Sequence, residues 1–192
     1  MTRRLLVTLL VVAMGLLAGC VPPWTVVRQI VPNPMLGQTT FVVMPIDFAG
    51  VQVGSGSEGS YLADKDADSR RSWADDKASM NSLFAGALRS HAREDGLNVV
   101  PPSQAAPFVI HSKVVFIEPG FFTAFVNKDS EVQMFITITT ADGMVLDEIT
   151  LAHATPSTLT TPGVGHRLRD DAEALGRYAA RYLITRVTGV KE

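Results

Sequence analysis

The four histidines, His91, His111, His153 and His166, are the side chains best suited to acid–base catalysis or metal binding. Their spacing matches neither an H-E-x-x-H pair nor a set with paired cysteines, which are the patterns that zinc sites use. The sequence also lacks the G-x-S-x-G turn that presents a nucleophilic serine. Because catalysis needs a nucleophile, a base and an orienting group within mutual reach, we expect a protein that is not an enzyme and holds no metal or cofactor.

Carboxylates gather between residues 58 and 76, where clustered oxygens could bind calcium: Glu58, Asp64, Asp66, Asp68, Asp75 and Asp76. The stretch D-K-D-A-D-S lacks the glycine and the distant glutamate of an EF-hand loop, so a solvated acidic loop is the favoured interpretation. A hydrolase site assembled from dispersed residues, such as His111, Glu118 and His153, is a distant alternative.

Cys20 is the only cysteine, so it can form neither an internal disulfide nor a thiolate metal cluster. It ends a segment with two arginines, an apolar run and small residues, which are the three parts of an export signal. The rival interpretation is a transmembrane helix over residues 5–21, which carry no charge and number 17, about the shortest length that spans a bilayer. Pro22 and Pro23 would end such a helix abruptly.

The sequence LAGC at positions 17–20 separates these alternatives, because it resembles the bacterial lipoprotein signal. The resemblance implies that residues 1–19 are removed and that Cys20 becomes an acylated first residue. Several acyl chains hold a protein on a membrane durably, whereas one chain gives marginal binding. Val21 stands where an aspartate would resemble the inner-membrane retention signal, so the resemblance implies the outer membrane, facing the periplasm.

The composition describes a chain that can build a core. It has 192 residues, 46% hydrophobic and 19% charged, which fits one domain and excludes wholesale disorder. The net charge of −2 becomes −4 when the signal with its two arginines is removed. A mildly acidic protein is a poor nucleic-acid binder, because phosphates require clustered Lys and Arg.

The remaining chain divides into a lipidated tether at 20–38 and a single α+β domain at 39–192. The segment after Cys20 carries four prolines and predicts an extended linker, partly docked on the domain through Trp24, Val26, Val27 and Ile30 or lying at the headgroups.

Two amphipathic helices are predicted at 72–95 and 166–187. The first has a capping box at Ser72 and Asp75, and the second contains Gly176, which close packing against the sheet would explain. Their apolar stripes are Met80, Leu83, Phe84, Ala87, Leu88 and His91 in the first helix, and Leu168, Ala172, Leu175, Ala179, Tyr182 and Leu183 in the second.

Five segments read as strands: 39–48, 97–100, 108–118, 131–140 and 144–153. The last three alternate apolar and polar residues, with Ile110, Val114 and Phe116 on one face of the first of them. Asp142-Gly143 predicts a tight hairpin turn. We expect an α+β fold with a mixed, mainly antiparallel sheet and two amphipathic helices on one face. The Gly/Ser/Asp-rich segment 49–71 is predicted to be a mobile loop.

An unusual connection, EPGFFTAFVNKDS, spans residues 118–130 and places Phe121, Phe122 and Phe125 in a turn that would normally be polar. One interpretation is that the rings fold back and close the core. The other is an exposed aromatic tip that contacts a partner protein, lipid or apolar ligand, because exposed apolar patches usually mark contacts. The hydroxyl-rich stretch at 155–165 is a second possible recognition loop, although a plain connection is favoured.

The lipoprotein signal, the strand FVVMPIDF, the long helix and the ending HRLRDDAEALGRYAARYLITRV together resemble a family of uncharacterised proteobacterial lipoproteins. The domain of that family resembles the N-terminal domain of TolB and the periplasmic part of the curli-secretion lipoprotein. The resemblance would cover about residues 39–188 and implies assembly or scaffolding in the envelope without catalysis. The segment 118–130 is too short to match the membrane-spanning hairpins of the curli protein.

The sequence therefore predicts an outer-membrane lipoprotein, held on the membrane through Cys20, whose domain binds a protein partner in an envelope complex. A lipid or glycolipid carrier, with Phe121, Phe122 and Phe125 lining a groove, is the second hypothesis.

Overall fold

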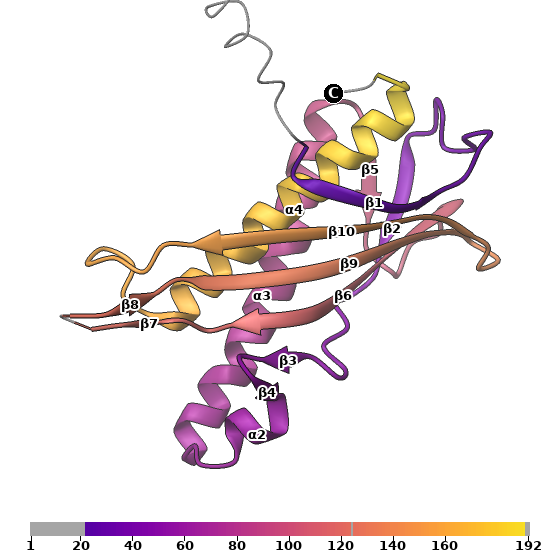
Figure 1. Cartoon of the computed structure of the whole chain (residues 1–192). Helices are drawn as coiled ribbons and strands as arrows, with labels where there is room; N and C mark the ends of the chain where they lie inside the picture. The colour runs from indigo at the N-terminus through magenta and orange to yellow at the C-terminus, as the bar shows by residue number, and fades with distance from the viewer. Residues whose placement is uncertain (1–21, 124, 191–192) are drawn as a thin grey trace, which may run out of the picture.

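A twisted sheet forms the centre of the computed structural model, and two long helices cross one of its faces (Figure 1). The structure describes residues 22–123 and 125–190. The predicted signal at 1–19 and the lipidation point Cys20 lie outside these residues. The fold is α+β, as the sequence predicts.

The main sheet has eight strands, with the order β1-β10-β9-β6-β2-β5 and the short β3 and β4 attached beside β6. β6, β9, β10 and β1 are antiparallel, whereas β2 is parallel to both β5 and β6. The strands span Trp24–Gln29 (β1), Thr40–Val43 (β2), Gln52–Val53 (β3), Gly56–Ser57 (β4), Asn98–Val100 (β5), Phe108–Glu118 (β6), Phe121–Phe122 (β7), Asn127–Lys128 (β8), Ser130–Thr140 (β9) and Val145–Thr155 (β10).

The three long strands alternate as predicted, with one departure in β6. The register of β6 against β9 shifts between Val114 and Phe116, so a bulge turns the strand over. Ile117 is therefore fully buried, whereas Phe116 is only half-buried. The prediction that Phe116 shares the inner face of Val114 was wrong, because a one-residue insertion reverses a period of two.

The first long helix, α3 (Ala67–Glu94), begins five residues before the predicted start. Its N-cap is Asp66, whose carboxylate accepts a hydrogen bond from the Ser69 amide at 2.7 Å. The predicted cap at Ser72 was wrong, because Ser72 already lies in the second turn of α3 and Asp66 takes the capping position. Within the predicted stripe, Met80, Phe84, Ala87 and Leu88 are buried, and Leu83 and His91 are half-buried.

The closing helix, α4 (Val164–Thr188), matches the predicted one within two residues, and all six residues of its predicted stripe are buried. It packs closely on α3, and Gly176 lies at this contact. A Cβ at Gly176 would lie 2.4 Å from the Phe84 carbonyl oxygen and 2.9 Å from the Ala87 Cβ. The predicted close contact therefore exists, but it is made with a helix and not with the sheet.

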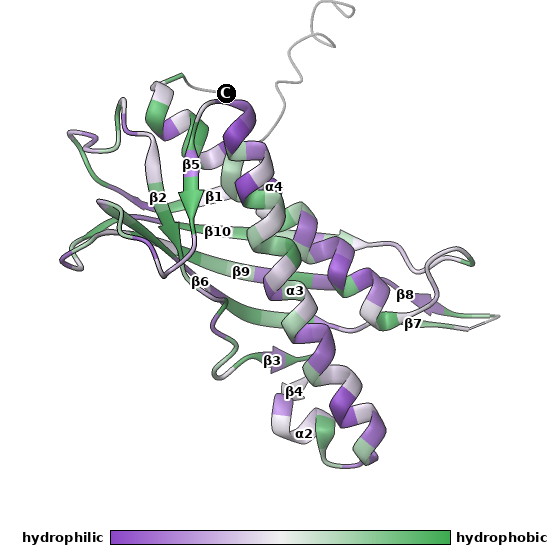
Figure 2. Ribbon diagram, turned by 180° about the vertical axis from the view of Figure 1, so that it is seen from behind, coloured by the Kyte–Doolittle hydropathy of each residue, from purple (hydrophilic) through white to green (hydrophobic). Residues whose placement is uncertain are grey.

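The core lies between the two helices and the inner face of the sheet. Figure 2 views the molecule from the helix side and shows largely hydrophobic strands behind α3 and α4. Val132, Met134, Ile136 and Ile138 of β9 are all buried against this layer. Across 22–123 and 125–190, no helix combines the length and the apolar character that a bilayer crossing requires.

The segment predicted as a tether contains a strand of the sheet. β1 lies along β10, with Trp24 opposite Leu151 and Gln29 opposite Asp147. The Trp24 ring also stands edge-on to Tyr182, with the centroids 5.7 Å apart. The folded domain therefore begins well before residue 39, because pairing with β10 orders the segment that local sequence alone marks as irregular.

Asp147 fixes the chain that follows β1. Its carboxylate is fully buried and accepts hydrogen bonds from Tyr182 Oη at 2.6 Å, Arg186 Nε at 2.6 Å and the Ile30 amide at 3.2 Å. Burial raises the pKa of Tyr182, and the hydrogen bond to Asp147 raises it further, so the phenol keeps its proton and remains a donor. Asn33 Nδ2 then donates to the Arg186 carbonyl at 2.6 Å. We call Asp147, Tyr182 and Arg186 the Asp147 cluster.

Residues 49–71 were predicted to be a loop and contain β3, β4 and a short helix, α2 (Glu58–Leu62). Glu58 Oε1 accepts hydrogen bonds from Trp73 Nε1 at 2.6 Å and Lys77 Nζ at 2.5 Å, which fasten α2 to α3. Burial raises the pKa of the Glu58 carboxyl, but these two donors more than offset it and hold the pKa below its usual value. Within the described ranges, no three His, Cys, Asp or Glu residues are grouped to hold a metal ion.

Candidate functional site: a hairpin tip and the buried cluster beneath it

The three phenylalanines of the predicted aromatic turn lie on a hairpin that extends beyond the sheet (Figure 1). Phe121 is 44% exposed, Phe125 is 97% exposed, and Phe122 is half-buried. Val126 is 61% exposed beside them. The prediction left open whether these rings close the core, and the structure places two of them in solvent. We call Phe121, Phe125 and Val126 the tip.

The hairpin leaves the sheet at Gly120. Pairing of β6 with β9 ends at Glu118 opposite Glu131, and β7 then pairs with β8 as a separate two-stranded ribbon. Gly120 has a φ of +62°, and a Cβ there would lie 2.4 Å from the Lys128 carbonyl oxygen. Glu118 holds both sides of this step, because it accepts hydrogen bonds from the Gly120 amide at 3.0 Å and from Lys128 Nζ at 2.5 Å.

The loop from β10 to α4 supports the hairpin from the side. The Ser157 hydroxyl donates to the Phe121 carbonyl at 2.9 Å, and the Ser157 amide donates to Asp129 at 2.8 Å. Leu159, two residues further on, is 85% exposed and adds a fourth large apolar side chain to this end of the molecule. Two loops that are distant in sequence therefore present apolar groups together.

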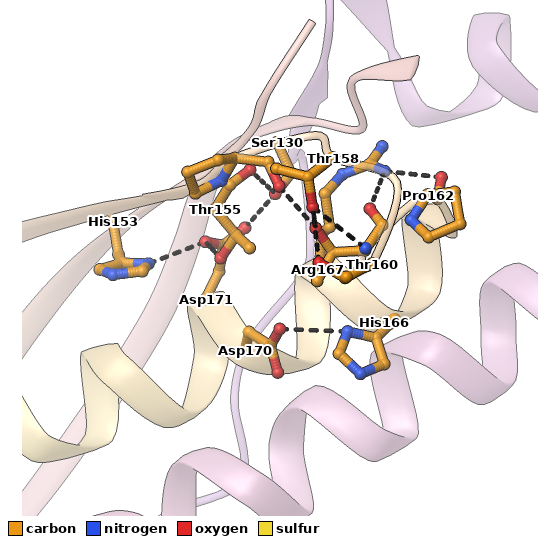
Figure 3. Close-up of polar contacts among 12 residues, drawn as sticks. Ser130, His153, Thr155, Thr158, Thr160, Pro162, His166, Arg167, Asp170 and Asp171 are labelled. Atoms are coloured by element: carbon orange, nitrogen blue, oxygen red, sulfur yellow. Dashed lines mark hydrogen bonds and ion pairs between the residues drawn. The ribbon is translucent and has the colours of Figure 1, made fainter. Parts of the chain in front are cut away.

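A buried polar cluster lies beneath the two loops (Figure 3). Asp171 of α4 is fully buried, and its carboxylate accepts hydrogen bonds from Thr155 Oγ1 at 2.6 Å and Ser130 Oγ at 2.7 Å. The Nδ1 atom of His153 lies 2.8 Å from Oδ1 of the same carboxylate. We call these four residues the Asp171 cluster. They join the start of β9, the end of β10 and the first half of α4.

Arg167, one turn before Asp171, connects the same helix to the two loops. It is fully buried, and its guanidinium donates to the carbonyls of Thr161 at 2.9 Å, Pro162 at 2.7 Å and Pro119 at 3.1 Å. Buried carbonyls outside helices and strands need hydrogen-bond donors. The planar guanidinium of Arg167 supplies donors to the hairpin and to the 156–163 loop. Arg167 therefore sets the position of the hairpin relative to the 156–163 loop.

The Asp171 cluster has the residue types of a hydrolytic triad in an order that does not activate a nucleophile. In such a triad the histidine takes the proton of the serine. Here the carboxylate stands between them, because Ser130 donates directly to Asp171 and His153 contacts the opposite oxygen. An acceptor in this position holds its donors in place, so the arrangement stabilises the hairpin end of the fold.

The dispersed residues named for a hydrolase do not come together. His111 lies opposite Thr137 and His153 opposite Val132, five positions apart along β9 and on opposite faces of the sheet. Glu118 is paired with Lys128 at the hairpin. Each of the three residues thus has a separate environment.

A surface hollow of about 590 Å³ lies between α2 and the hairpin. Its lining is mixed: the charged Lys65, Glu118 and Lys128 stand beside glycines, serines and the apolar Val53, Pro119 and Val164. Tyr61 also lines it, and burial together with the charges of Asp76 and Glu118 raises the pKa of its phenol. An apolar carrier groove would be lined mainly by aliphatic and aromatic groups.

Sequence reasoning found the aromatic turn but missed the residues that support it. Arg167 and Asp171 stand one helical turn apart, and the next turn brings Leu175 of the apolar stripe. That spacing of four was the available signal, because a charged residue in line with a buried stripe must be buried with it.

Fold and site together define a small α+β domain that presents a supported apolar hairpin. No family model and no curated protein sequence matches the chain. Among solved structures, it is similar to the PelC dodecamer from Paraburkholderia phytofirmans, at 19% identity and a TM-score of 0.40, over 81% of this chain and 96% of that one. A variant of that PelC gives 17% identity and a TM-score of 0.42 over the same shares. The hypothetical protein CT253 from Chlamydia trachomatis gives 8% identity and a TM-score of 0.46, over 76% of this chain and 97% of that chain. Likenesses this distant carry no functional inference.

Replacement of Arg167 by methionine should loosen the hairpin end while leaving most of the fold intact. The change removes three hydrogen bonds to carbonyls but also removes a buried charge, so we expect a global loss of only about 1–2 kcal/mol. Amide hydrogen exchange should accelerate at least tenfold in residues 119–129 and 156–163, and stay unchanged in β9. As a control, Arg169→Met removes a half-exposed contact with Asp76 and should change neither region. Equal exchange in both variants would contradict the role of Arg167.

Proposed function

We propose that this protein is a lipid-anchored scaffold or accessory subunit of a cell-envelope assembly, and that it binds a protein partner through the tip. The observation that supports the proposal is the exposure of Phe125 and Phe121 on a hairpin that Arg167 and the Asp171 cluster hold in place. Exposed aromatic rings on a rigid support bind at low entropic cost, because little must be ordered on association. The chain acts without catalysis in this proposal.

The envelope location is proposed from the sequence. The lipoprotein signal ending at Cys20 implies an acyl anchor, and Val21 favours the outer membrane with the domain facing the periplasm. The tip projects from the end of the sheet, where a neighbouring protein in the same compartment can reach it.

Site-specific photocrosslinking in cells tests the partner. A benzophenone amino acid in place of Phe125 should give a protein adduct of defined mass, because Phe125 is almost fully exposed. Met144 provides the matched control, since it is 52% exposed and lies at the turn between β9 and β10, at the far end of the same strands. The adduct should be absent from the Met144 position. An adduct with lipid alone at Phe125 would contradict the protein-binding proposal and favour the carrier hypothesis.

The anchor is tested by Cys20→Ala. Without the thiol, lipid cannot be transferred, so the variant should accumulate as an unprocessed precursor that retains residues 1–19. Immunoblotting of fractionated cells measures its size and location. A cleaved, freely soluble product from the variant would show that lipidation at Cys20 is not what processes and holds the chain.

A further inference from the structure

Exposed aliphatic side chains gather around β1 and the end of α4, apart from the tip. Val26 and Val27 of β1 are 43% and 57% exposed, and Val31, in the loop that follows β1, is 85% exposed. This loop contacts the C-terminal end of α4, where the Gly37 amide donates to the Val187 carbonyl at 2.9 Å. We call this set the β1 patch: Val26, Val27, Val31, Leu36 and Val190.

β1 begins next to this patch, only four residues after Cys20. Two peptide links join Cys20 to Pro22, so their Cα atoms are at most about 7 Å apart. Trp24 begins β1, packs on Tyr182 and carries the Arg181 guanidinium 5.8 Å from the centre of its ring. Any lipid attached to Cys20 is therefore held close to the start of β1, and the Asp147 cluster prevents β1 from swinging away.

We infer that the β1 patch lies against the phospholipid bilayer and sets the orientation of the domain on the membrane. This inference rests on the proposed acyl anchor at Cys20. β1 is the outermost strand of the sheet, and its side chains after Trp24 are all exposed. Valine side chains have few rotamers to lose, so they can enter the interface at little entropic cost.

An exposed basic side chain beside the patch fits a membrane that contains anionic lipid. Arg28 is exposed on β1 between Val27 and Val31. Glu148 lies opposite Arg28 on β10 and is half-buried. Basic groups at the level of lipid headgroups are attracted to anionic phospholipids, whereas an acidic rim would be repelled.

This orientation leaves the tip free. β1 runs away from the hairpin, because Trp24 lies opposite Leu151 and Gln29 opposite Asp147, while β10 continues to Thr155 beside the hairpin. With β1 on the bilayer, the long strands run roughly along the membrane surface and the tip projects sideways. The sheet edge nearest the membrane and the partner-binding end are then different parts of the domain.

Nitroxide labelling of the acylated full-length protein tests the inference. Cys20 is the only cysteine and is blocked by lipid, so a cysteine introduced by Val27→Cys or Val31→Cys is the single free thiol. The protein is reconstituted in vesicles of phosphatidylethanolamine and phosphatidylglycerol, and the ratio of oxygen to nickel-chelate collision rates is measured. This ratio should be at least about threefold higher at both positions than at the control Ser72→Cys, an exposed position near the start of α3, which lies beside α2 and away from β1 (Figure 1).

Three outcomes would overturn the inference in distinguishable ways. If the protein does not float with the vesicles, the acyl anchor itself fails and the inference fails with it. If it floats but the labels at 27 and 31 match the label at 72, the anchor stands and the membrane-facing patch does not. If a label at Phe125→Cys enters lipid while those at 27 and 31 stay aqueous, the domain lies on its tip instead.

Discussion

The Asp147→Ala variant should lose about 3–5 kcal/mol of unfolding free energy, because the change leaves the Arg186 guanidinium buried without its carboxylate. Arg186 is 12% exposed and Asp147 is fully buried, so solvent cannot replace the lost partner. Tyr182 Oη and the Ile30 amide lose an acceptor at the same time. The loss can be measured by urea unfolding, followed by the fluorescence of Trp24 and Trp73.

Two further variants separate the ion pair from general damage. Asp147→Leu combined with Arg186→Met removes both charges and should be markedly more stable than Asp147→Ala, because no buried charge remains. Glu173→Gln breaks the half-exposed pair with Arg177 on the same helix and should change stability by less than about 0.5 kcal/mol. If Asp147→Ala were as mild as Glu173→Gln, the cluster would not hold the N-terminal segment.

Replacement of Gly176 by alanine should destabilise the fold by about 1–2 kcal/mol, although alanine is the better helix former. Helix propensity favours the change by about 1 kcal/mol. The new Cβ would lie 2.4 Å from the Phe84 carbonyl oxygen and 2.9 Å from the Ala87 Cβ, and the carbonyl is a backbone atom of α3 that cannot move alone. Overpacking between the helices therefore outweighs propensity, and urea unfolding should show an earlier midpoint.

Gly86 provides the matched control on the partner helix. It lies in the interior of α3, and a Cβ there would meet no atom within 4 Å. Gly86→Ala should therefore stabilise the protein by about 0.5–1 kcal/mol through propensity alone. A stabilising Gly176→Ala would mean that the helices do not approach as closely as the structure places them.

The parts of the fold that follow a simple period were predictable from the sequence. The stripe from Leu168 to Leu183 defined α4 almost to its ends, and the alternation through Ile136 defined β9. Both signals are local, since burial on one face imposes its period on the residues of that element alone.

What the sequence could not show depends on distant partners. β1 is ordered by β10, more than 100 residues away, and its residues after Trp24 are exposed. Prolines lie in the sequence on both sides of it. The bulge after Val114 leaves no mark in composition, yet it decides that Ile117 and not Phe116 enters the core.

Of the candidate site, the sequence indicated the aromatic turn but not the residues that support it, because the support depends on contacts between distant segments. The phenylalanines stood out because aromatic residues are unusual in a turn, and whether they contact a partner remains a prediction. The support beneath them was not predicted, because the spacing of Arg167 and Asp171 indicates only that they share a helix face with Leu175. Their partners, the carbonyl of Pro119 and the hydroxyl of Ser130, come from distant parts of the chain.

The pairing of β1 with β10 also bears on mechanical load. A pull on the chain at Pro22, in line with the strand, acts along the interface with β10 and strains its hydrogen bonds together instead of one at a time. Beyond β1, the load passes to the ion pair of Asp147 with Arg186 and so to the end of α4. If the proposed anchor at Cys20 holds this end, force on the anchor would pass through the folded core to the far end of the sheet.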